Sequence, residues 1–141
     1  MEPLDLTKLP PRPPHEELDG LIFLPRTIDK LRASLPGGNR GDYSIAGFSV
    51  AMFETIGVSE EQMLGAVLEA ATDEDVARWL RGHADTAKYA VFKTWLESRE
   101  LNDENRERLH KRYPVCARDS ALIKLIDILR ADDRECFASP R

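Results

Sequence analysis

Apolar residues recur along the chain with the three- and four-residue spacing of amphipathic helices. Ile28, Leu31 and Leu35 follow this spacing in a segment that begins near Pro25, a residue suited to the first turn of a helix, and that stops at Pro36 and two glycines. Six further helices are predicted at 48–56, 59–71, 72–81, 86–99, 103–113 and 119–131. No alternation of apolar and polar residues is long enough for a convincing strand. The pattern therefore predicts an all-α fold of six or seven short helices.

Two of the predicted helices begin with recognisable capping signals. Ser59 to Gln62 fits the capping-box pattern, in which the serine hydroxyl accepts a hydrogen bond from the third amide and the glutamine side chain reaches back. Thr72 is followed by three acidic residues, which interact favourably with the positive end of a helix dipole. Gly57 is expected to end the helix at 48–56, and Gly82 the helix that begins at Thr72.

The first fourteen residues carry five prolines and differ from the rest of the chain. Because proline lacks an amide donor and holds the chain extended, we expect residues 1–14 to form an arm without regular structure. Leu4, Leu6 and Leu9 can attach this arm to a helical domain formed by residues 15–141. A proline-rich ligand for an aromatic groove is the alternative interpretation of the arm.

The composition is that of a soluble globular protein, and it limits the choice of partners. The 141 residues, 42% of them hydrophobic and 32% charged, suffice for a single domain with one core. No apolar run approaches the roughly 18 residues of a membrane span, and the first residues lack the features of a signal peptide, so a cytoplasmic location is expected. A net charge of −5 argues against a protein that neutralises phosphate backbones. We therefore expect neither a nucleic acid nor a membrane as partner.

Charge is unevenly distributed along the chain. Residues 41–104 hold 5 basic and 13 acidic side chains, whereas residues 105–141 hold 9 basic and 6 acidic ones. An acidic middle and a mildly basic end can attract each other within one fold or between two copies in a homodimer. The sequence leaves both arrangements open, and solvated helix faces are the simpler explanation.

The chain lacks the motifs of the common cofactor, metal and nucleophile sites. Glycine-rich residues 37–41 have neither the Lys-Ser/Thr that completes a P-loop nor a preceding strand, so we expect a loop that ends a helix. The three histidines do not have metal-ligand spacing. Cys116 and Cys136 are expected to be free thiols, and Cys116 is the better candidate for a reactive one. We therefore predict no cofactor and no metal.

One short segment, residues 20–43, concentrates ion-pairing side chains. On the predicted helix, Arg26 and Asp29, and likewise Asp29 and Arg32, are three residues apart and can pair with each other. If the glycine-rich loop folds back, the residues after it can meet the basic face of the helix and line a pocket for an anion, which arginine binds with bidentate hydrogen bonds. The alternative is a self-satisfied salt-bridge network. The candidate ligand-binding residues are Arg26, Asp29, Lys30, Arg32, Asp42 and Tyr43.

Two functions fit this segment. The first is a non-enzymatic binding or interaction protein, for a small anionic ligand or a protein partner, whose recognition surface is the helix at 25–35 and the loop to residue 43. The second is an enzyme acting on a small metabolite that bears phosphate or carboxylate, in which two arginines hold the anion and Asp29 or Tyr43 transfers a proton. No nucleophile, base or metal set is recognisable, so the first function is favoured and no catalytic residue is assigned.

Several motifs, in order along nearly the whole chain, resemble those of one bacterial family. They are LDLTK at 4–8, PRPP at 11–14, LPRTIDKLRASLPG at 24–37, GDY at 41–43, FETIGV at 53–58 and LIDILRADDRECF at 125–137. The family is described only as a domain of unknown function, number five thousand and sixty-nine. The resemblance implies a small, mostly helical, single-domain protein without an established activity. The chain departs from the family pattern at residues 44–51, where members often have cysteine, proline and aspartate, and at His15, where a basic residue is usual.

Overall fold

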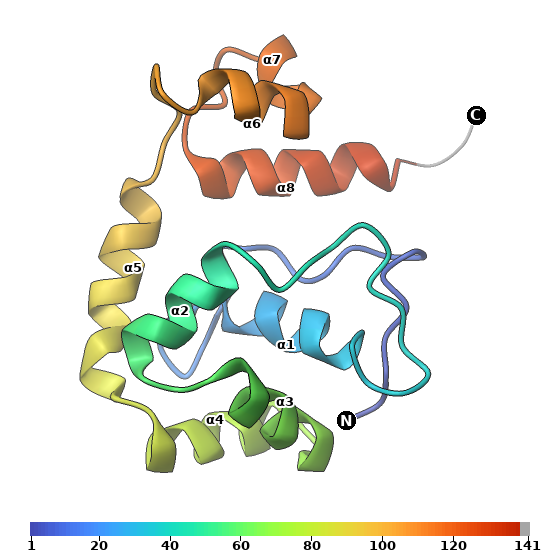
Figure 1. Ribbon diagram of the computed structural model, residues 1–141, viewed down its shortest axis with the longest axis vertical. Helices are drawn as coiled ribbons and strands as arrows, with labels where there is room; N and C mark the ends of the chain where they lie inside the picture. Colours follow the sequence, from blue (N-terminus) through green and yellow to red (C-terminus); the bar gives the residue numbers. More distant parts are fainter. Residues whose placement is uncertain (139–141) are drawn as a thin grey trace. The chain divides into compact units, whose positions relative to one another are not determined.

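Helices form most of the ordered chain in the computed structural model, which describes residues 1–138 (Figure 1). Within these residues there are eight α-helices, one short 3-10 helix and a two-stranded sheet. The chain divides into two units, Met1–Lys93 and Thr94–Arg141. The prediction of a mostly helical protein is confirmed, and the prediction that residues 15–141 form one domain stays a prediction.

The first unit contains four α-helices and the first half of a fifth. They are α1 (Leu24–Arg32), α2 (Phe48–Ile56), α3 (Glu60–Glu69), α4 (Asp73–His83) and, after the 3-10 turn Thr86–Lys88, the first part of α5 (Tyr89–Ser98). Helix α1 packs against α3, and α3 packs against α4 (Figure 1). The bounds predicted for α2 are confirmed, and Gly57 caps this helix with a positive φ of 79°. Both predicted capping motifs form, at Ser59 and at Thr72.

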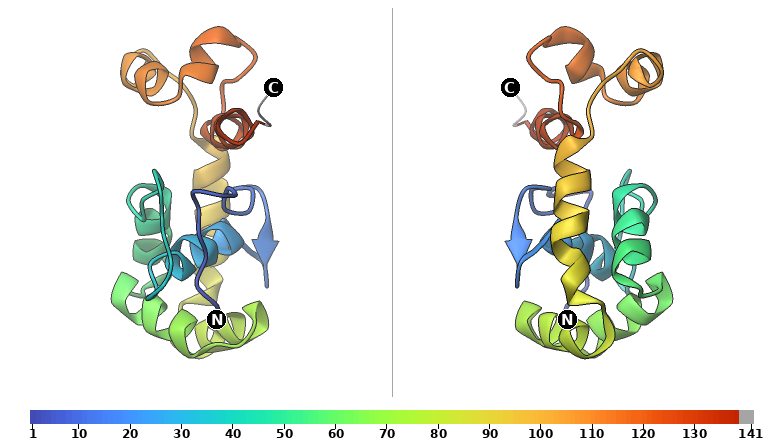
Figure 2. Two further views of the ribbon diagram at one scale, coloured as in Figure 1. Left: turned by 90° about the vertical axis from the view of Figure 1, so that its right-hand side faces the viewer. Right: turned by 90° about the vertical axis from the view of Figure 1, so that its left-hand side faces the viewer.

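A small hairpin precedes α1 and corrects the all-α prediction. Strands β1 (Glu17–Leu18) and β2 (Leu21–Ile22) are antiparallel, and β1 contacts α1. Asp19 and Gly20 connect them with φ angles of 52° and 82°, which is the pattern of a two-residue type I′ turn. Figure 2 shows this hairpin, drawn as an arrow, beside α1. Each strand has two residues, too few for an alternating pattern to reveal.

Helix α1 is a central element of its unit. Every residue from Leu24 to Leu31 is buried, and these include the charged residues Arg26, Asp29 and Lys30. These three residues belong to the helix at 25–35 that the sequence offered as a recognition surface, and their side chains are buried. An isolated amphipathic pattern could not show that other parts of the chain, described below, cover the charged face as well as the apolar one.

The second unit contains the end of α5 and three further helices. They are α6 (Arg106–Arg112), α7 (Pro114–Arg118) and α8 (Leu125–Cys136). The helix predicted at 103–113 was expected to stop before Pro114, and α6 does end before it; this proline then starts α7, in the N-terminal position that proline favours. The predicted helix at 119–131 begins instead at Leu125, because residues 123–125 pair with the chain around residue 100. The amide of Leu101 donates to the carbonyl of Ile123 (2.8 Å), and the amide of Leu125 donates to the carbonyl of Arg99 (3.0 Å).

Two other helix ends differ from the sequence prediction. Helix α1 stops at Arg32, and the chain continues to Leu35 in turns. Helix α4 continues through Gly82 to His83, because tertiary packing outweighs the cost of about 1 kcal/mol for one glycine inside a helix.

The proline-rich segment at 1–14 contains neither a helix nor a named strand. Leu6 is buried and its amide donates to the carbonyl of Asn39 (2.7 Å), whereas Leu9 is 48% exposed. Attachment through Leu6 is therefore observed and attachment through Leu9 is not; an extended arm stays a prediction. Within residues 1–138, no helix combines the length and the apolar character needed to cross a membrane.

Candidate functional site

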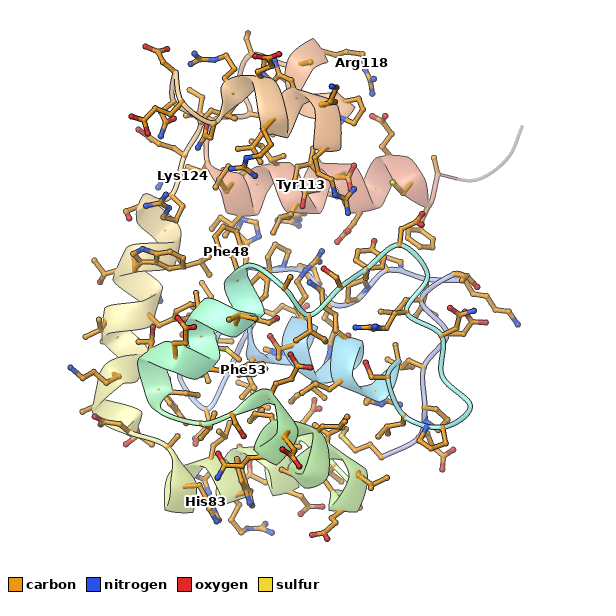
Figure 3. The ribbon with its side chains drawn as sticks, viewed as in Figure 1. Phe48, Phe53, His83, Tyr113, Arg118 and Lys124 are labelled. Carbon is orange, nitrogen blue, oxygen red and sulfur yellow. The ribbon has the colours of Figure 1, made fainter. Side chains whose placement is uncertain are left out.

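The start of α1 is unusual in both sequence and backbone conformation. The N-cap position usually holds Ser, Thr, Asp or Asn, but here it holds Phe23, which makes no side-chain capping hydrogen bond. Phe23 has φ 73° and ψ −8°, a left-handed conformation that bulky residues rarely adopt. Its ring is buried and lies edge-on to the ring of Phe48, with the two centroids 5.9 Å apart. Figure 3 labels Phe48, at the start of α2. Such strain persists only where the surroundings enforce it, and it is concentrated at ligand clamps and active sites.

Two cationic side chains of α1 lie over the ring of Phe23. The guanidinium carbon of Arg26 is 5.9 Å from the ring centroid and the Nζ of Lys30 is 5.6 Å from it. The guanidinium carbon of Arg26 is also 5.6 Å from the ring centroid of Tyr43, in the loop that follows α1. Arg26 is 2% exposed and Lys30 is 7% exposed. All three cation–ring distances fall within the range of cation–π attraction, which strengthens when the cation is desolvated.

The carboxylate between these two cations on α1, that of Asp29, is bound by Arg12 from the proline-rich segment. The backbone amide of Arg12 donates to Asp29 Oδ2 (2.8 Å), its Nε–H lies between both oxygens (3.1 and 3.2 Å), and its Nη2–H donates to Oδ1 (3.0 Å). The other side of the same guanidinium holds Asp73, the first residue of α4, at 2.6 and 3.1 Å. Arg12 therefore joins the N-terminal segment, α1 and α4.

Arg12 also contacts Arg26 directly. The Nη1–H of Arg26 donates to the backbone carbonyl of Arg12 at 3.3 Å. Partial burial acts to lower the pKa of Arg12, but hydrogen bonds to Asp73 and Asp29 outweigh this effect and raise the pKa above its ordinary value. Arg12 therefore keeps its positive charge and neutralises the two carboxylates that it holds.

The structure brings together four of the six residues that the sequence selected. Arg26 and Lys30 lie over the ring of Phe23, and Arg26 also lies over the ring of Tyr43. Asp29 is linked to Arg26 through Arg12. Their role in binding a ligand stays a prediction.

The other two candidates contribute no contact to this cluster within residues 1–138. The Nε–H of Arg32 donates to the carbonyl of Glu2 (2.7 Å), and Asp42 is exposed. The predicted pairing of Asp29 with Arg26 or Arg32 within the helix is wrong, because the partner of Asp29 is Arg12. The fork of an arginine on another segment offers more donors to both carboxylate oxygens than a neighbour one turn away on the same helix.

Sequence reasoning missed three members of the cluster, namely Arg12, Phe23 and Asp73. A signal existed for two of them. Arg12 is the one charged residue within a run of prolines, whose fixed backbone orders its side chain at little cost. Phe23 occupies a position where a capping residue was due. For Asp73, an acidic residue in the first turn of a helix had a sufficient local explanation, and only the fold shows its second role.

Other candidate chemistry in the chain has structural explanations. His83 lies on α4, at the lower edge of Figure 3, where its ring stacks on that of Trp79 with centroids 4.3 Å apart and its Nδ1 is 2.8 Å from the Trp79 carbonyl oxygen. Among residues 1–138, no three His, Cys, Asp or Glu side chains are placed to hold a metal ion. The thiol of Cys116 is buried, burial raises its pKa, and it donates to the carbonyl of Leu109 at 3.6 Å. Burial of this kind disfavours the reactive thiolate.

Comparison with known families identifies the family of this chain. The model of the family described as Domain of unknown function (DUF5069) matches residues 8–134. The chain belongs to the DUF5069 family. The match includes Arg12, α1, Tyr43 and Asp73, so every residue of the cluster lies within the part of the chain that defines a DUF5069 domain. No curated protein matches the chain.

Proposed function

We propose that this DUF5069 protein is a binding protein that recognises a small anionic group, such as a phosphate or carboxylate, at Arg26 and Lys30. The observation that carries the proposal is that these two cations lie over the ring of Phe23, whose backbone is left-handed, and that Arg26 also lies over the ring of Tyr43. Both side chains are buried, where electrostatic attraction is stronger than in water. An anion that binds between them gains from the same low dielectric environment.

Arg26 and Tyr43 also supply suitable chemistry. The planar fork of an arginine matches the geometry of carboxylate and phosphate oxygens, and a phenolic hydroxyl can donate one further hydrogen bond. Since Arg26 and Lys30 are 2% and 7% exposed, the bound group is small and its entry requires local opening of the chain around α1. We assign this opening to the proline-rich residues 1–14, which we propose form an extended arm over the unit.

The alternative function, an enzyme acting on an anionic metabolite, has less support. It assigned proton transfer to Asp29 or Tyr43. Both oxygens of Asp29 accept hydrogen bonds from Arg12, so Asp29 is not placed to take a proton from a substrate. Tyr43 is the other residue to which this alternative assigns proton transfer. The cytoplasmic location, the bacterial origin and a homodimer stay proposals that accompany this one.

Thermal denaturation with added anions tests the proposal. The full chain is heated with inorganic phosphate, pyrophosphate or citrate, at constant ionic strength. A ligand at 100 times its dissociation constant adds about 2.7 kcal/mol to the free energy of unfolding and raises the midpoint by several degrees. Lys30→Met keeps the length and burial of the side chain without its charge, and should abolish the shift. Arg40→Ala, which removes an exposed charge in the following loop, is the matched control and should keep it.

Two results would contradict the proposal. One is the absence of a shift with all three anions. The other is a shift that Lys30→Met and Arg40→Ala retain equally, because the anion then acts through general ionic effects and not through the buried cations of α1.

A further inference from the structure

We infer that Asp19–Gly20, at the tip of the β1–β2 hairpin, is a site of spontaneous aspartate isomerisation and that Arg81 of α4 slows this reaction. In isoaspartate, the product, the backbone runs through the side-chain carbonyl carbon in place of the main-chain one. The mass is unchanged and the backbone is one atom longer. The inference concerns a covalent modification and does not depend on the anion site proposed above.

The reaction needs only these two residues and water. The amide nitrogen of Gly20 attacks Cγ of Asp19, so that an N–C bond forms. One carboxyl oxygen leaves as water, together with the amide proton and one proton from solvent, and the product is a neutral five-membered succinimide ring. Water then opens the ring: cleavage at the former side-chain carbonyl restores aspartate, and cleavage at the main-chain carbonyl leaves isoaspartate with a free α-carboxylate.

The sequence and the exposure of the turn favour attack at this position. Asp19–Gly20 is the one aspartate–glycine step in the chain, and a glycine has no side chain to hinder the approach to its nitrogen. Both residues are exposed. Among the described residues, none beyond the two chain neighbours of Gly20 lies within 4 Å of the place where its Cβ would be. Water and a modifying enzyme can therefore reach the tip.

Arg81 opposes the reaction because it binds the group that is lost. Its Nε–H donates to Oδ2 of Asp19 at 2.8 Å, and its Nη2–H donates to Oε1 of Glu74 at 2.8 Å, so two carboxylates hold the guanidinium in place. The succinimide is neutral and has one oxygen fewer than the carboxylate, so the ion pair cannot persist through ring closure. An interaction that is made in the reactant and lost in the transition state raises the barrier.

The position of this step in the hairpin gives the modification a structural consequence. The two-residue turn sets a register in which Leu18 lies opposite Leu21 and Glu17 lies opposite Ile22. Isoaspartate adds one atom to the backbone of the turn, and a change in turn length shifts the pairing that the turn fixes. Leu21 and Ile22 are 0% and 3% exposed, so such a shift exposes apolar surface directly before α1.

Mass spectrometry of the full chain, kept for several weeks at physiological temperature and neutral pH, measures the reaction. Trypsin does not cleave between Arg12 and Pro13, so it releases Asp19 within one peptide, residues 9–26. Electron-transfer fragmentation then distinguishes isoaspartate from aspartate at equal mass. Isoaspartate is expected at residue 19 of the wild-type protein. The variant Asp19→Glu, whose longer side chain cannot close a five-membered ring, should lack it.

Three variants connect the rate to the contact with Arg81. Arg81→Gln removes the guanidinium and should raise the rate of isoaspartate formation about two- to fivefold, the factor that corresponds to an exposed ion pair. Arg78→Gln is the matched control: it removes an exposed arginine of the same helix, whose partner is Asp75, and should leave the rate unchanged. Arg81→Lys keeps the charge without the planar fork and should give an intermediate rate.

A measurement on the unfolded chain separates the contact from a general effect of the substitution. In guanidinium chloride, where the fold no longer brings Arg81 to Asp19, wild type and Arg81→Gln should isomerise at the same rate. A rate difference that persists there overturns the inference. It is also overturned if residue 19 stays aspartate in both folded proteins, if folded Arg81→Gln reacts no faster than wild type, or if Arg78→Gln accelerates the reaction equally.

Discussion

The backbone of Phe23 gives a sharp prediction about stability. Replacing Phe23, whose ring is buried, should cost about 3–5 kcal/mol in Phe23→Ala, because the core loses a large side chain. Phe23→Gly removes one carbon more than Phe23→Ala, and a glycine variant is normally less stable than the alanine variant by roughly 0.5–1 kcal/mol. At φ 73°, however, a side chain with a Cβ pays about 1–2 kcal/mol that glycine does not. The glycine variant should therefore be more stable than the alanine variant, by up to about 1 kcal/mol.

Phe53 in α2 is the matched control for this comparison. Its ring is also buried, at 3% exposure, but it lies inside a regular helix. There Phe53→Gly should be less stable than Phe53→Ala by about 1 kcal/mol. The order of the two variants is thus expected to reverse between positions 23 and 53.

Equilibrium unfolding in urea, followed by far-ultraviolet circular dichroism, measures the four free energies. Sodium sulfate, which strengthens burial, keeps the least stable variants folded at the start of the titration. If alanine is the better substituent at both positions, the left-handed conformation of residue 23 does not carry strain. The reasoning that connects this strain to the site of Arg26 and Lys30 would then lose its basis.

Two further predictions follow from the ion pairs and the helix caps. Asp29→Asn should lower the free energy of unfolding, measured in urea, by about 2–4 kcal/mol, because it breaks the largely buried pair of Asp29 with Arg12. Glu74→Gln breaks the exposed pair of Glu74 with Arg81 and should cost less than about 1 kcal/mol. Equal losses in the two variants would contradict this expectation. The backbone amides of Ala71 and Thr72 donate to Asp75 and lower its pKa in the folded state. The ionised carboxylate therefore stabilises the fold at pH values above its ordinary pKa of 3.8. This stabilisation is lost as the pH falls through the lowered pKa of the folded state. Asp75→Asn should therefore flatten the acid side of the stability profile, and an unchanged profile below about pH 4 would show that Asp75 does not contribute to it.

Local signals in the sequence were sufficient for much of the first unit. Three local features form as predicted: a glycine at the end of α2, a capping box before α3 and acidic residues after Thr72. Each of them involves interactions between residues no more than four apart. The spacing within α1 also selected Arg26, Asp29 and Lys30 as one group. Helix periodicity and capping depend on near neighbours, which a sequence displays directly.

The start of α8 shows where local signals fail. Residues 119–124 have the composition of a helix, but the amide of Leu101 and the carbonyl of Arg99 pair with the chain at 123 and 125. Contacts between segments more than twenty residues apart thus override a local preference, which is worth only a few tenths of a kcal/mol per residue.

The candidate site also combines features that the sequence predicts with features that only the tertiary structure shows. The sequence by itself determined which charged side chains share α1, because a helix fixes their spacing. Only the tertiary structure decided that Asp29 pairs with Arg12, 17 residues away, and that the same arginine reaches Asp73, 61 residues away. It also placed Phe23 in a left-handed conformation beneath Arg26 and Lys30. The physical reason is that a buried charge takes the partner that the whole fold brings closest, and distance along the chain does not encode that choice.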